Sequence, residues 1–232
     1  MGMTTSDVRA VIFDMDGLLA DTEPLSYRAW TALIARDYGV VPTAEDAEWA
    51  TATVGKHWPE VWRMIAERFR LPVELPRDLA RLNEAYRAIY GDILAQGVPA
   101  LPGAIELVAT CHAAGVLVGL ASSSSPGQIE QVLDRIGIRD QFAAITSGSE
   151  VPRSKPDPAI YLLACERLGV APREAVALED SGPGVTAAHA AGLRCLAIPS
   201  HYTAAHDFSR ASATRPTLVG LTIADLAALP WR

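Results

Sequence analysis

The stretch VIFDMDGLLADTEPL, from Val11 to Leu25, carries the strongest indication of the fold. Its apolar run ends in two aspartates, Asp14 and Asp16, and Gly17 follows at once. Carboxylates at the end of a buried strand are costly unless other groups compensate their charge. The stretch therefore predicts a strand that delivers two acidic side chains to a place where their charge is neutralised.

The composition indicates a globular protein. Of the 232 residues, 50% are hydrophobic and 20% are charged, and the 16 prolines and 17 glycines are spread along the chain. This length suits one domain with an insertion, or two small domains. The net charge of -7 argues against a nucleic-acid-binding surface, which needs basic clusters. We expect no nucleic-acid partner.

The cysteines and the hydropathy suggest where the protein works. Cys111, Cys165 and Cys195 are odd in number and widely spaced, which fits neither a disulfide framework nor a Cys-rich zinc site. No apolar run approaches the roughly 20 residues of a membrane helix. The opening residues, MGMTTSDVRA, lack the pattern of a signal peptide. We expect a monomer in the reducing cytoplasm, with no membrane partner.

Short apolar runs alternate with helical patterns over most of the chain. The runs are continuous rather than alternating, as in parallel strands that are covered on both faces. The expected strands are Val8–Phe13, Val116–Ala121, Phe142–Thr146, Ala175–Leu178 and Cys195–Pro199. The expected helices, each followed by a glycine stop signal, are Pro102–Ala114, Pro126–Ile136, Pro158–Leu168 and Val185–Ala191. This alternation predicts an α/β fold with a doubly wound, Rossmann-like parallel sheet.

The first connection between strands is much longer than the others. It spans roughly a hundred residues, far more than one crossover needs, and its apolar spacing is helical. The expected helices are Pro24–Arg36, Pro59–Phe69 and Arg77–Leu94. We expect an α/β core domain of residues 1–18 and 97–232, with a helical cap domain of residues 19–96 inserted. A helical subdomain with only a packing role is the alternative, but its place directly after the acidic turn favours a lid.

Polar residues follow the strands at the edge where open α/β sheets bind their ligands. Clustered carboxylates repel one another at low dielectric, and a hard cation such as Mg²⁺ relieves that repulsion. A lysine, a serine hydroxyl and the free N–H groups that open a helix suit a bound phosphate. The residues at these strand ends are Asp14, Asp16, Ser122–Ser125, Lys155, Glu179 and Asp180.

Four motifs, DMDGLL, ASSSS, KPDP and EDSGPGV, resemble the four signature motifs of the haloacid dehalogenase (HAD) superfamily. They occur in order over nearly the whole chain. The likeness is greatest to the branch of phosphatases and β-phosphoglucomutase-like proteins, which carry a helical cap between the first two motifs. The resemblance implies a HAD core and hydrolysis of a small phosphorylated metabolite, such as a sugar phosphate.

The resemblance also implies roles for the motif residues. Asp14 matches the nucleophile that forms an aspartyl-phosphate, and Asp16 matches the general acid and base. Ser122 matches the hydroxyl that grips phosphate, and Lys155 the lysine that orients the nucleophile. The implied Mg²⁺ ligands are the side chains of Asp14, Glu179 and Asp180 and the backbone carbonyl of Asp16.

Substrate-binding residues are expected in two places. Ser123 and Ser124 adjoin the phosphate-gripping serine, although serines in this run can instead cap the helix or face solvent. In the cap, the family places a specificity loop near Gly55, Lys56 and His57, although a Gly-Lys turn is more often structural. One of the acids Glu179 and Asp180 could instead cap the helix that begins near Pro183.

Three functions remain open, in decreasing order of support: a phosphatase, a phosphomutase and a catalytically idle binding protein. Asp16 favours phosphate esters, because family dehalogenases and phosphonatases lack an acid there. The β-phosphoglucomutase pattern has basic residues in its cap at places that fall at or near Ser26, Trp58 and Leu82 here, and none of these is basic, which favours hydrolysis. The nearby basic residues Lys56, His57 and Arg81 keep the mutase alternative open.

Overall fold

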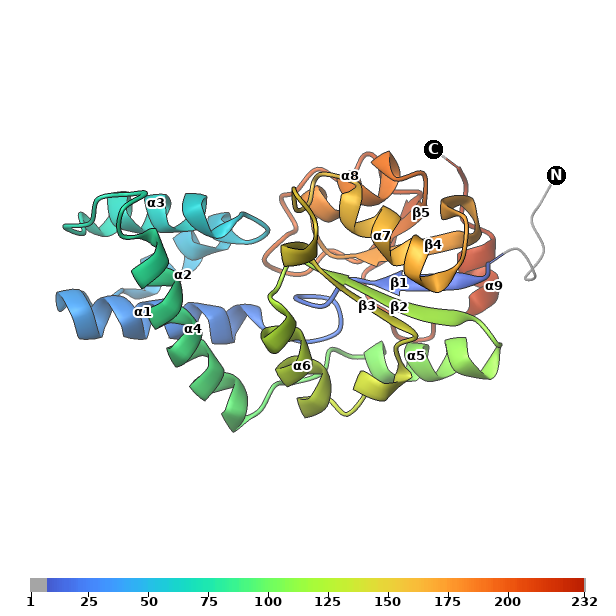
Figure 1. Ribbon diagram of the computed structural model, residues 1–232, viewed down its shortest axis with the longest axis horizontal. Helices are drawn as coiled ribbons and strands as arrows, with labels where there is room; N and C mark the ends of the chain where they lie inside the picture. The colour runs from blue at the N-terminus through green and yellow to red at the C-terminus, as the bar shows by residue number, and fades with distance from the viewer. Residues whose placement is uncertain (1–7, 232) are drawn as a thin grey trace. The chain divides into compact units, whose positions relative to one another are not determined.

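The computed structural model describes residues 8–231. Their contacts divide the chain into two compact units. The first joins the described residues up to Asp21 with those from Val98 onward, and the second is Thr22–Gly97. The sheet lies in the first unit, whereas the second consists of helices and loops (Figure 1). Among the described residues, no helix has the length and apolar character needed to span a bilayer.

The six-stranded sheet has the order β3-β2-β1-β4-β5-β6, and every paired strand is parallel to its neighbour. The order runs outward from β1 in both directions, as in a doubly wound sheet, so the predicted fold class is confirmed. The strands are β1 (Ala10–Phe13), β2 (Leu117–Ser122), β3 (Ala144–Ser147), β4 (Ala175–Glu179), β5 (Arg194–Ala197) and β6 (Ala213–Thr214).

Some of the predicted strand bounds are wrong. Strand β1 begins at Ala10 rather than Val8, level with the first residues of both neighbouring strands. Strand β3 begins after Phe142, because a 3-10 turn at Arg139–Gln141 precedes it. Strand β5 stops before Pro199, which has no N–H to donate to the ladder. Strand β6 was not predicted, and its two residues pair with the end of β5.

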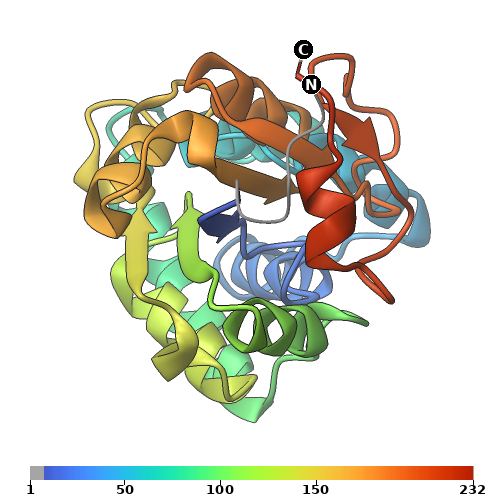
Figure 2. The same cartoon turned by 90° about the vertical axis from the view of Figure 1, so that its right-hand side faces the viewer.

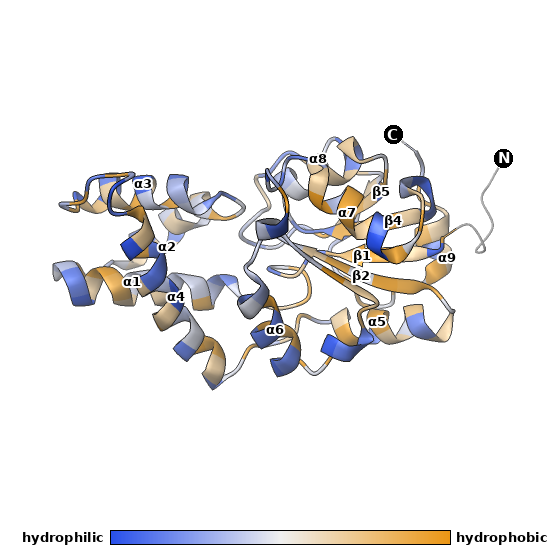
Figure 3. Cartoon of the chain, in the orientation of Figure 1, coloured by the Kyte–Doolittle hydropathy of each residue, from blue (hydrophilic) through white to orange (hydrophobic). Residues whose placement is uncertain are grey.

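Helices cover both faces of the sheet (Figures 1 and 2). Helices α5 (Ala104–Ala113) and α6 (Pro126–Arg135) lie on one face. Helices α7 (Ala159–Leu168) and α8 (Gly182–Ala190) lie on the other, where their buried residues form one apolar cluster with alternate strand residues such as Ile12. Figure 3 shows β1 and β2 hydrophobic almost throughout, as double-sided burial requires. The remaining short elements are 3-10 turns at Gly148–Glu150 and Pro172–Glu174 and helix α9 (Ile223–Ala227).

Helix α8 begins earlier than the predicted Val185. Its N-cap is Ser181, whose hydroxyl accepts a hydrogen bond from the Gly184 N–H at 3.2 Å. Pro183 fits the first turn, where the missing N–H costs nothing. Because Ser181 caps this helix, the alternative in which Glu179 or Asp180 is the cap is wrong.

The strand register brings the motifs to one edge of the sheet. Phe13 of β1 lies opposite Leu120 of β2 and Leu178 of β4. The residues that follow, Asp14, Ala121 and Glu179, are therefore level with one another at the carboxyl ends of three adjacent strands. A one-residue slip in either pairing would turn alternate side chains to the opposite face and separate them.

The second unit contains helices α1 (Glu23–Tyr38), α2 (Ala44–Ala50), α3 (Trp58–Phe69) and α4 (Leu79–Gln96), with a 3-10 turn at Thr51–Thr53. The predicted apolar face of α1 is confirmed by burial of Leu25, Ala29, Trp30, Leu33 and Ile34. Helix α2 was not predicted, because the sequence AEDAEWA is short and mostly polar. It begins where the Thr43 N–H donates to Asp46 Oδ2 at 2.8 Å.

Candidate active site

The turn after β1 presents the two aspartates. The Asp14 N–H still donates to the Leu178 carbonyl at 3.0 Å, so Asp14 continues the strand pairing. Gly17 then takes a positive φ of 76°, and its N–H donates to the Ala20 carbonyl at 2.9 Å. A side chain at Gly17 would also collide with the Asp180 carboxylate. Glycine therefore meets two demands here, the turn conformation and the close approach of an acid.

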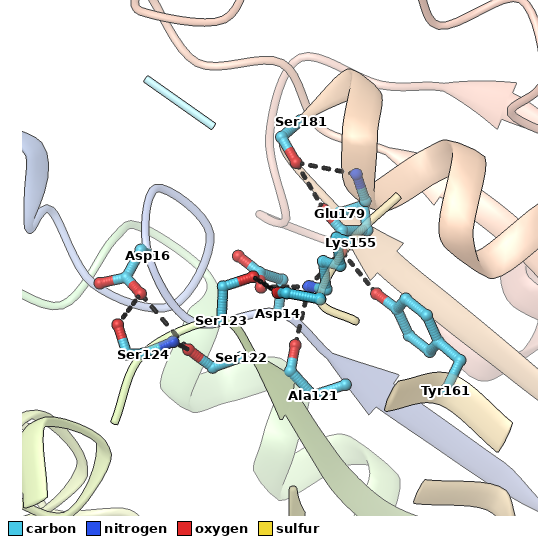
Figure 4. Close-up of polar contacts among 12 residues, drawn as sticks. Asp14, Asp16, Ala121, Ser122, Ser123, Ser124, Lys155, Tyr161, Glu179 and Ser181 are labelled. Carbon is cyan, nitrogen blue, oxygen red and sulfur yellow. Dashed lines mark hydrogen bonds and ion pairs between the residues drawn. The ribbon is translucent and has the colours of Figure 1, made fainter. Parts of the chain in front are cut away.

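Lys155 connects the first and last motifs at the strand ends (Figure 4). Its Nζ donates to Asp14 Oδ1 at 2.6 Å, to Glu179 Oε1 at 2.6 Å and to the Ala121 carbonyl at 2.8 Å. These three acceptors use all three ammonium hydrogens. The Lys155 side chain is only 5% exposed. The lysine predicted from KPDP therefore lies against the predicted nucleophile, although 141 positions separate them in the sequence.

The site formed by Asp14, Lys155 and Glu179 carries more negative than positive charge. Burial raises the pKa of Asp14 to about 7, even though the adjacent Lys155 acts to lower it. The charges of Glu179 and Asp16 raise it further. Burial by itself would lower the pKa of Lys155, but the charges of Asp14 and Glu179 and their hydrogen bonds outweigh burial, so its pKa is raised. Lys155 is therefore a permanent cation that does not by itself keep Asp14 ionised at neutral pH.

Three carboxylates in this centre suit a divalent cation. Asp14, Glu179 and Asp180 are buried and each offers an oxygen within 4.8 Å of the others'. When all three are ionised, three negative charges against the single ammonium of Lys155 leave a formal charge of -2. Hard oxygen donors with this charge are the ligands that Mg²⁺ prefers. The residues present therefore fit the predicted Mg²⁺ site.

Asp16 lies beside the serines rather than in the carboxylate cluster (Figure 4). Its Oδ2 accepts a hydrogen bond from the Ser124 hydroxyl at 2.9 Å, and the Ser122 hydroxyl lies at 3.4 Å. The Ser124 N–H donates to Ser122 Oγ at 3.1 Å. Asp16 is half-buried, whereas Asp14 is buried. The two aspartates of one motif thus have different surroundings, which suits them to different chemical roles.

The other predicted substrate-binding residues make different contacts. The Ser123 hydroxyl is exposed and lies 3.0 Å from that of Ser154, whereas Ser125 is the N-cap residue of α6. Gly55, Lys56 and His57 lie in the second compact unit, in the exposed turn that precedes α3. There the Lys56 ammonium donates to Glu60 Oε1 at 2.8 Å.

Sequence reasoning missed three residues that hold Glu179 in place. The Tyr161 hydroxyl donates to Glu179 Oε1 at 2.6 Å, and the Ser181 hydroxyl donates to Oε2 at 3.1 Å. Gly184 packs against the same carboxylate with no room for a side chain. Ser181 and Gly184 belong to the motif EDSGPGV, so the sequence did carry a signal for them. Tyr161 gave no signal, because it fits the apolar face of a helix.

Comparison with known proteins agrees with this geometry. A family model described as haloacid dehalogenase-like hydrolase matches residues 8–192. Hexitol phosphatase B of Escherichia coli (strain K12) is 34% identical over 209 residues, covering 85% of this chain and 86% of its own. CbbY of Cereibacter sphaeroides is 36% identical over 211 residues, covering 88% and 90%.

The fold is also similar to solved structures. CbbY from Rhodobacter sphaeroides in complex with phosphate superposes with a TM-score of 0.81 at 32% identity, covering 94% of this chain and 99% of that one. A mutant of that protein was solved in complex with xylulose-(1,5)bisphosphate, and it superposes with a TM-score of 0.80. The likeness therefore extends over both compact units of the chain.

Proposed function

This chain belongs to the haloacid dehalogenase-like hydrolases, and we propose that it is a Mg²⁺-dependent phosphatase of small phosphorylated metabolites such as sugar phosphates. The observation that carries the proposal is the buried centre of Asp14, Lys155, Glu179 and Asp180 at the strand ends. The similar proteins that are named hexitol phosphatase or that bind phosphate support the substrate class.

The first half of the reaction transfers the phosphoryl group to the protein. The Asp14 carboxylate attacks phosphorus and forms an aspartyl-phosphate as the ester P–O bond breaks. Asp16 gives its proton to the departing alcohol oxygen. Lys155 keeps the attacking carboxylate in place and offsets the phosphate charge, and the Ser122 hydroxyl holds a phosphate oxygen.

The second half releases inorganic phosphate. Asp16, now ionised, takes a proton from a water molecule that attacks the aspartyl-phosphate, and the Asp14 carboxylate is regenerated. When bound, Mg²⁺ would supply positive charge to Asp14, Glu179, Asp180 and the phosphate. The pKa of about 7 for Asp14 supports this requirement, since Lys155 alone leaves much of the nucleophile protonated near neutral pH.

The second compact unit, Thr22–Gly97, has the role of a cap domain in this proposal, and residues outside it form the core domain. The exposed residues Gly55, Lys56 and His57 contact the organic part of the substrate. We also place the protein in the cytoplasm as a monomer, without nucleic-acid or membrane partners. Burial of Cys111, Cys165 and Cys195 as free thiols supports a reducing compartment.

Hydrolysis is favoured over phosphoryl transfer within a sugar bisphosphate. A phosphomutase must hold a second phosphate with cationic groups. In this chain the Ser26 hydroxyl lies 3.0 Å from that of Tyr86, Trp58 packs on Tyr86 with ring centroids 4.1 Å apart, and Leu82 is 1% exposed. These three positions, expected to be basic in a mutase, form apolar and hydroxyl contacts instead.

Turnover of p-nitrophenyl phosphate tests the proposal. Protein dialysed against EDTA should be inactive, and addition of Mg²⁺ should restore hydrolysis. Asp14→Asn, prepared in the same way, controls for contaminating phosphatases and should stay inactive at every Mg²⁺ concentration. Full turnover in excess EDTA would refute the metal requirement, and turnover by Asp14→Asn would refute the assigned nucleophile.

A panel of phosphorylated metabolites separates the phosphatase from the mutase. The panel contains hexitol, sugar and glycerol monophosphates, phosphoglycolate and a pentulose bisphosphate. A second assay supplies β-glucose-1-phosphate with a trace of the bisphosphate. Release of inorganic phosphate faster than formation of glucose-6-phosphate is expected. The reverse ratio would establish the phosphomutase, and no turnover of any substrate would leave only a binding role.

A further inference from the structure

The Glu179 carboxylate accepts hydrogen bonds from three side chains. It is fully buried, with an exposed fraction of 0%. Its Oε1 accepts hydrogen bonds from Lys155 Nζ and from the Tyr161 hydroxyl, both at 2.6 Å, and its Oε2 accepts one from the Ser181 hydroxyl at 3.1 Å. Gly184 packs against one side of the carboxylate, because a Cβ there would overlap it. The Glu179 side chain is therefore fixed by its neighbours from several directions.

Tyr161 contributes to this arrangement in two ways (Figure 4). The hydroxyl of this fully buried α7 residue reaches across to the end of β4. The Lys155 ammonium lies 5.2 Å from the centroid of the Tyr161 ring, within the range of a cation–π contact. A phenol keeps its proton at neutral pH, so the hydroxyl remains a hydrogen-bond donor.

A packing role alone would not require the hydroxyl. Phenylalanine has the same ring and would fill the same space beside the α7 and α8 cluster at little cost in volume. The hydroxyl is aligned on the oxygen of Glu179 that also faces Lys155. Groups that orient a metal-binding side chain in this way commonly change metal affinity by about 10–100-fold when removed.

We propose that Tyr161 is a positioning residue whose hydroxyl, together with that of Ser181, fixes the Glu179 carboxylate and thereby sets the affinity of this site for Mg²⁺. This inference rests on the proposed function, since it assumes that Mg²⁺ binds at Asp14, Glu179 and Asp180. Tyr161 itself contacts neither substrate nor metal. It acts by holding Glu179 in one orientation together with Lys155, which donates to the same oxygen.

The test titrates MgCl₂ alone into metal-free protein by isothermal calorimetry, with folding verified by circular dichroism. Tyr161→Phe should raise the Mg²⁺ dissociation constant by about tenfold or more. Ser181→Ala should raise it less, because its bond to Glu179 is longer. Tyr38→Phe is the matched control: its hydroxyl accepts a 2.7 Å bond from Arg81 in the second unit, and its Mg²⁺ affinity should equal that of wild type.

Kinetics separate positioning from a general loss of stability. With p-nitrophenyl phosphate, Tyr161→Phe should need more Mg²⁺ for half-maximal rate, while kcat at saturating Mg²⁺ returns toward the wild-type value. A lower melting temperature with an unchanged Mg²⁺ dissociation constant would show a purely structural role and overturn the inference. If Tyr161→Phe does not fold, the same titration of Ser181→Ala decides, and unchanged affinity there overturns the inference.

The wild-type titration separates a failure of the proposed Mg²⁺ site from a failure of the proposed role of Tyr161. If wild-type protein binds no Mg²⁺, the proposed metal requirement fails and the role of Tyr161 falls with it. If wild-type protein binds Mg²⁺ and Tyr161→Phe binds it equally well, only the role of Tyr161 is refuted.

Discussion

Two lysines of this chain, Lys155 and Lys56, were both expected near the substrate, and the structure gives them opposite surroundings. Lys155 is 5% exposed and donates to two carboxylates and a backbone carbonyl. Lys56 is 36% exposed and pairs with Glu60 one helical turn away. The first pairing joins residues that are far apart in the sequence, whereas the second is a local contact on the surface of the second unit.

The contribution of an ion pair to stability depends on how deeply the pair is buried. An exposed pair gains about 0–1 kcal/mol, because water screens it and ordering the side chains is costly. Removing one partner of a buried pair costs about 3–5 kcal/mol, since the other charge is left uncompensated. Lys155 should therefore affect both stability and catalysis, whereas Lys56 is free to affect only the choice of substrate.

Replacement of the nucleophile should have the largest effect. Asp14→Asn should lower kcat by about 10⁴-fold or more, because no other group forms the covalent intermediate. The exposed control Asp134→Asn in α6 should keep wild-type kcat. Steady-state kinetics with p-nitrophenyl phosphate measure both, and residual activity within tenfold of wild type would contradict the assignment of Asp14.

The same variant should not lose stability when metal-free. In the folded protein the pKa of Asp14 is raised from 3.8 to about 7, so ionisation disfavours folding progressively between those values. Asparagine removes that penalty and keeps an oxygen for Lys155. Urea unfolding at pH 8 should therefore show Asp14→Asn at least as stable as wild type, with the advantage shrinking as the pH falls toward 4. A large loss of stability at pH 8 would contradict the raised pKa.

Lys155→Met should come next in size. It leaves Asp14 and Glu179 buried together without their cation, which should lower the free energy of unfolding by about 3–5 kcal/mol at pH 8 and abolish turnover. Urea titrations at pH 8 and pH 4 measure the change, and the cost should shrink at the lower pH as Asp14, whose pKa is raised to about 7, takes up a proton. A cost below about 1 kcal/mol would place Lys155 with the exposed pairs.

Asp46 in the second unit provides the opposite pH dependence to Asp14. Hydrogen bonds from the Thr43 N–H and from Arg68 hold the pKa of Asp46 below its ordinary value of 3.8. Its contribution to stability is therefore complete above pH 3.8 and is lost as the pH falls through the folded value. Asp46→Asn should be less stable than wild type at pH 7, and the difference should close on acidification.

Glu45→Gln is the control for that pH series, since Glu45 is an exposed neighbour on the same helix. Thermal unfolding from pH 7 down to pH 3 measures all three proteins. A constant gap between Asp46→Asn and wild type across this range would show that the effect comes from packing rather than from ionisation.

Lys56→Met should have the smallest effect. Its exposed pair with Glu60 predicts a change in stability below about 1 kcal/mol. If Lys56 contacts the substrate, KM or the ranking of substrates should change while Mg²⁺ affinity stays the same. Kinetics over the metabolite panel measure this. The control is Arg63→Met, because Arg63 forms a similar exposed pair with Glu67 one helical turn away. Identical kinetics over the whole panel would exclude Lys56 from substrate recognition.

Much of the fold was predictable because its signals are local. Continuous apolar runs mark β1, β2 and β4, and the spacing of Leu25, Trp30 and Leu33 marks the buried face of α1. The acidic, serine and lysine motifs stand next to those runs in the sequence, so their place at the strand ends follows from the strands themselves. Helix α2 and strand β6 were missed, because neither carries enough apolar pattern to be distinguished from a loop.

The contacts within the site depended on the tertiary structure. The sequence placed Asp14, Lys155 and Glu179 at strand ends. The 2.6 Å bonds from Lys155 to both carboxylates also required the order of the strands and the register of β1 against β4.

Tyr161 shows the same limit for a single side chain. In the sequence it is one more apolar residue of a helix, and only the packing of α7 against the sheet aims its hydroxyl at Glu179. Hydrophobic periodicity records which face of an element is buried, because burial acts on every residue of that face. A hydrogen bond between distant elements leaves no such repeat, so only the folded chain reveals it.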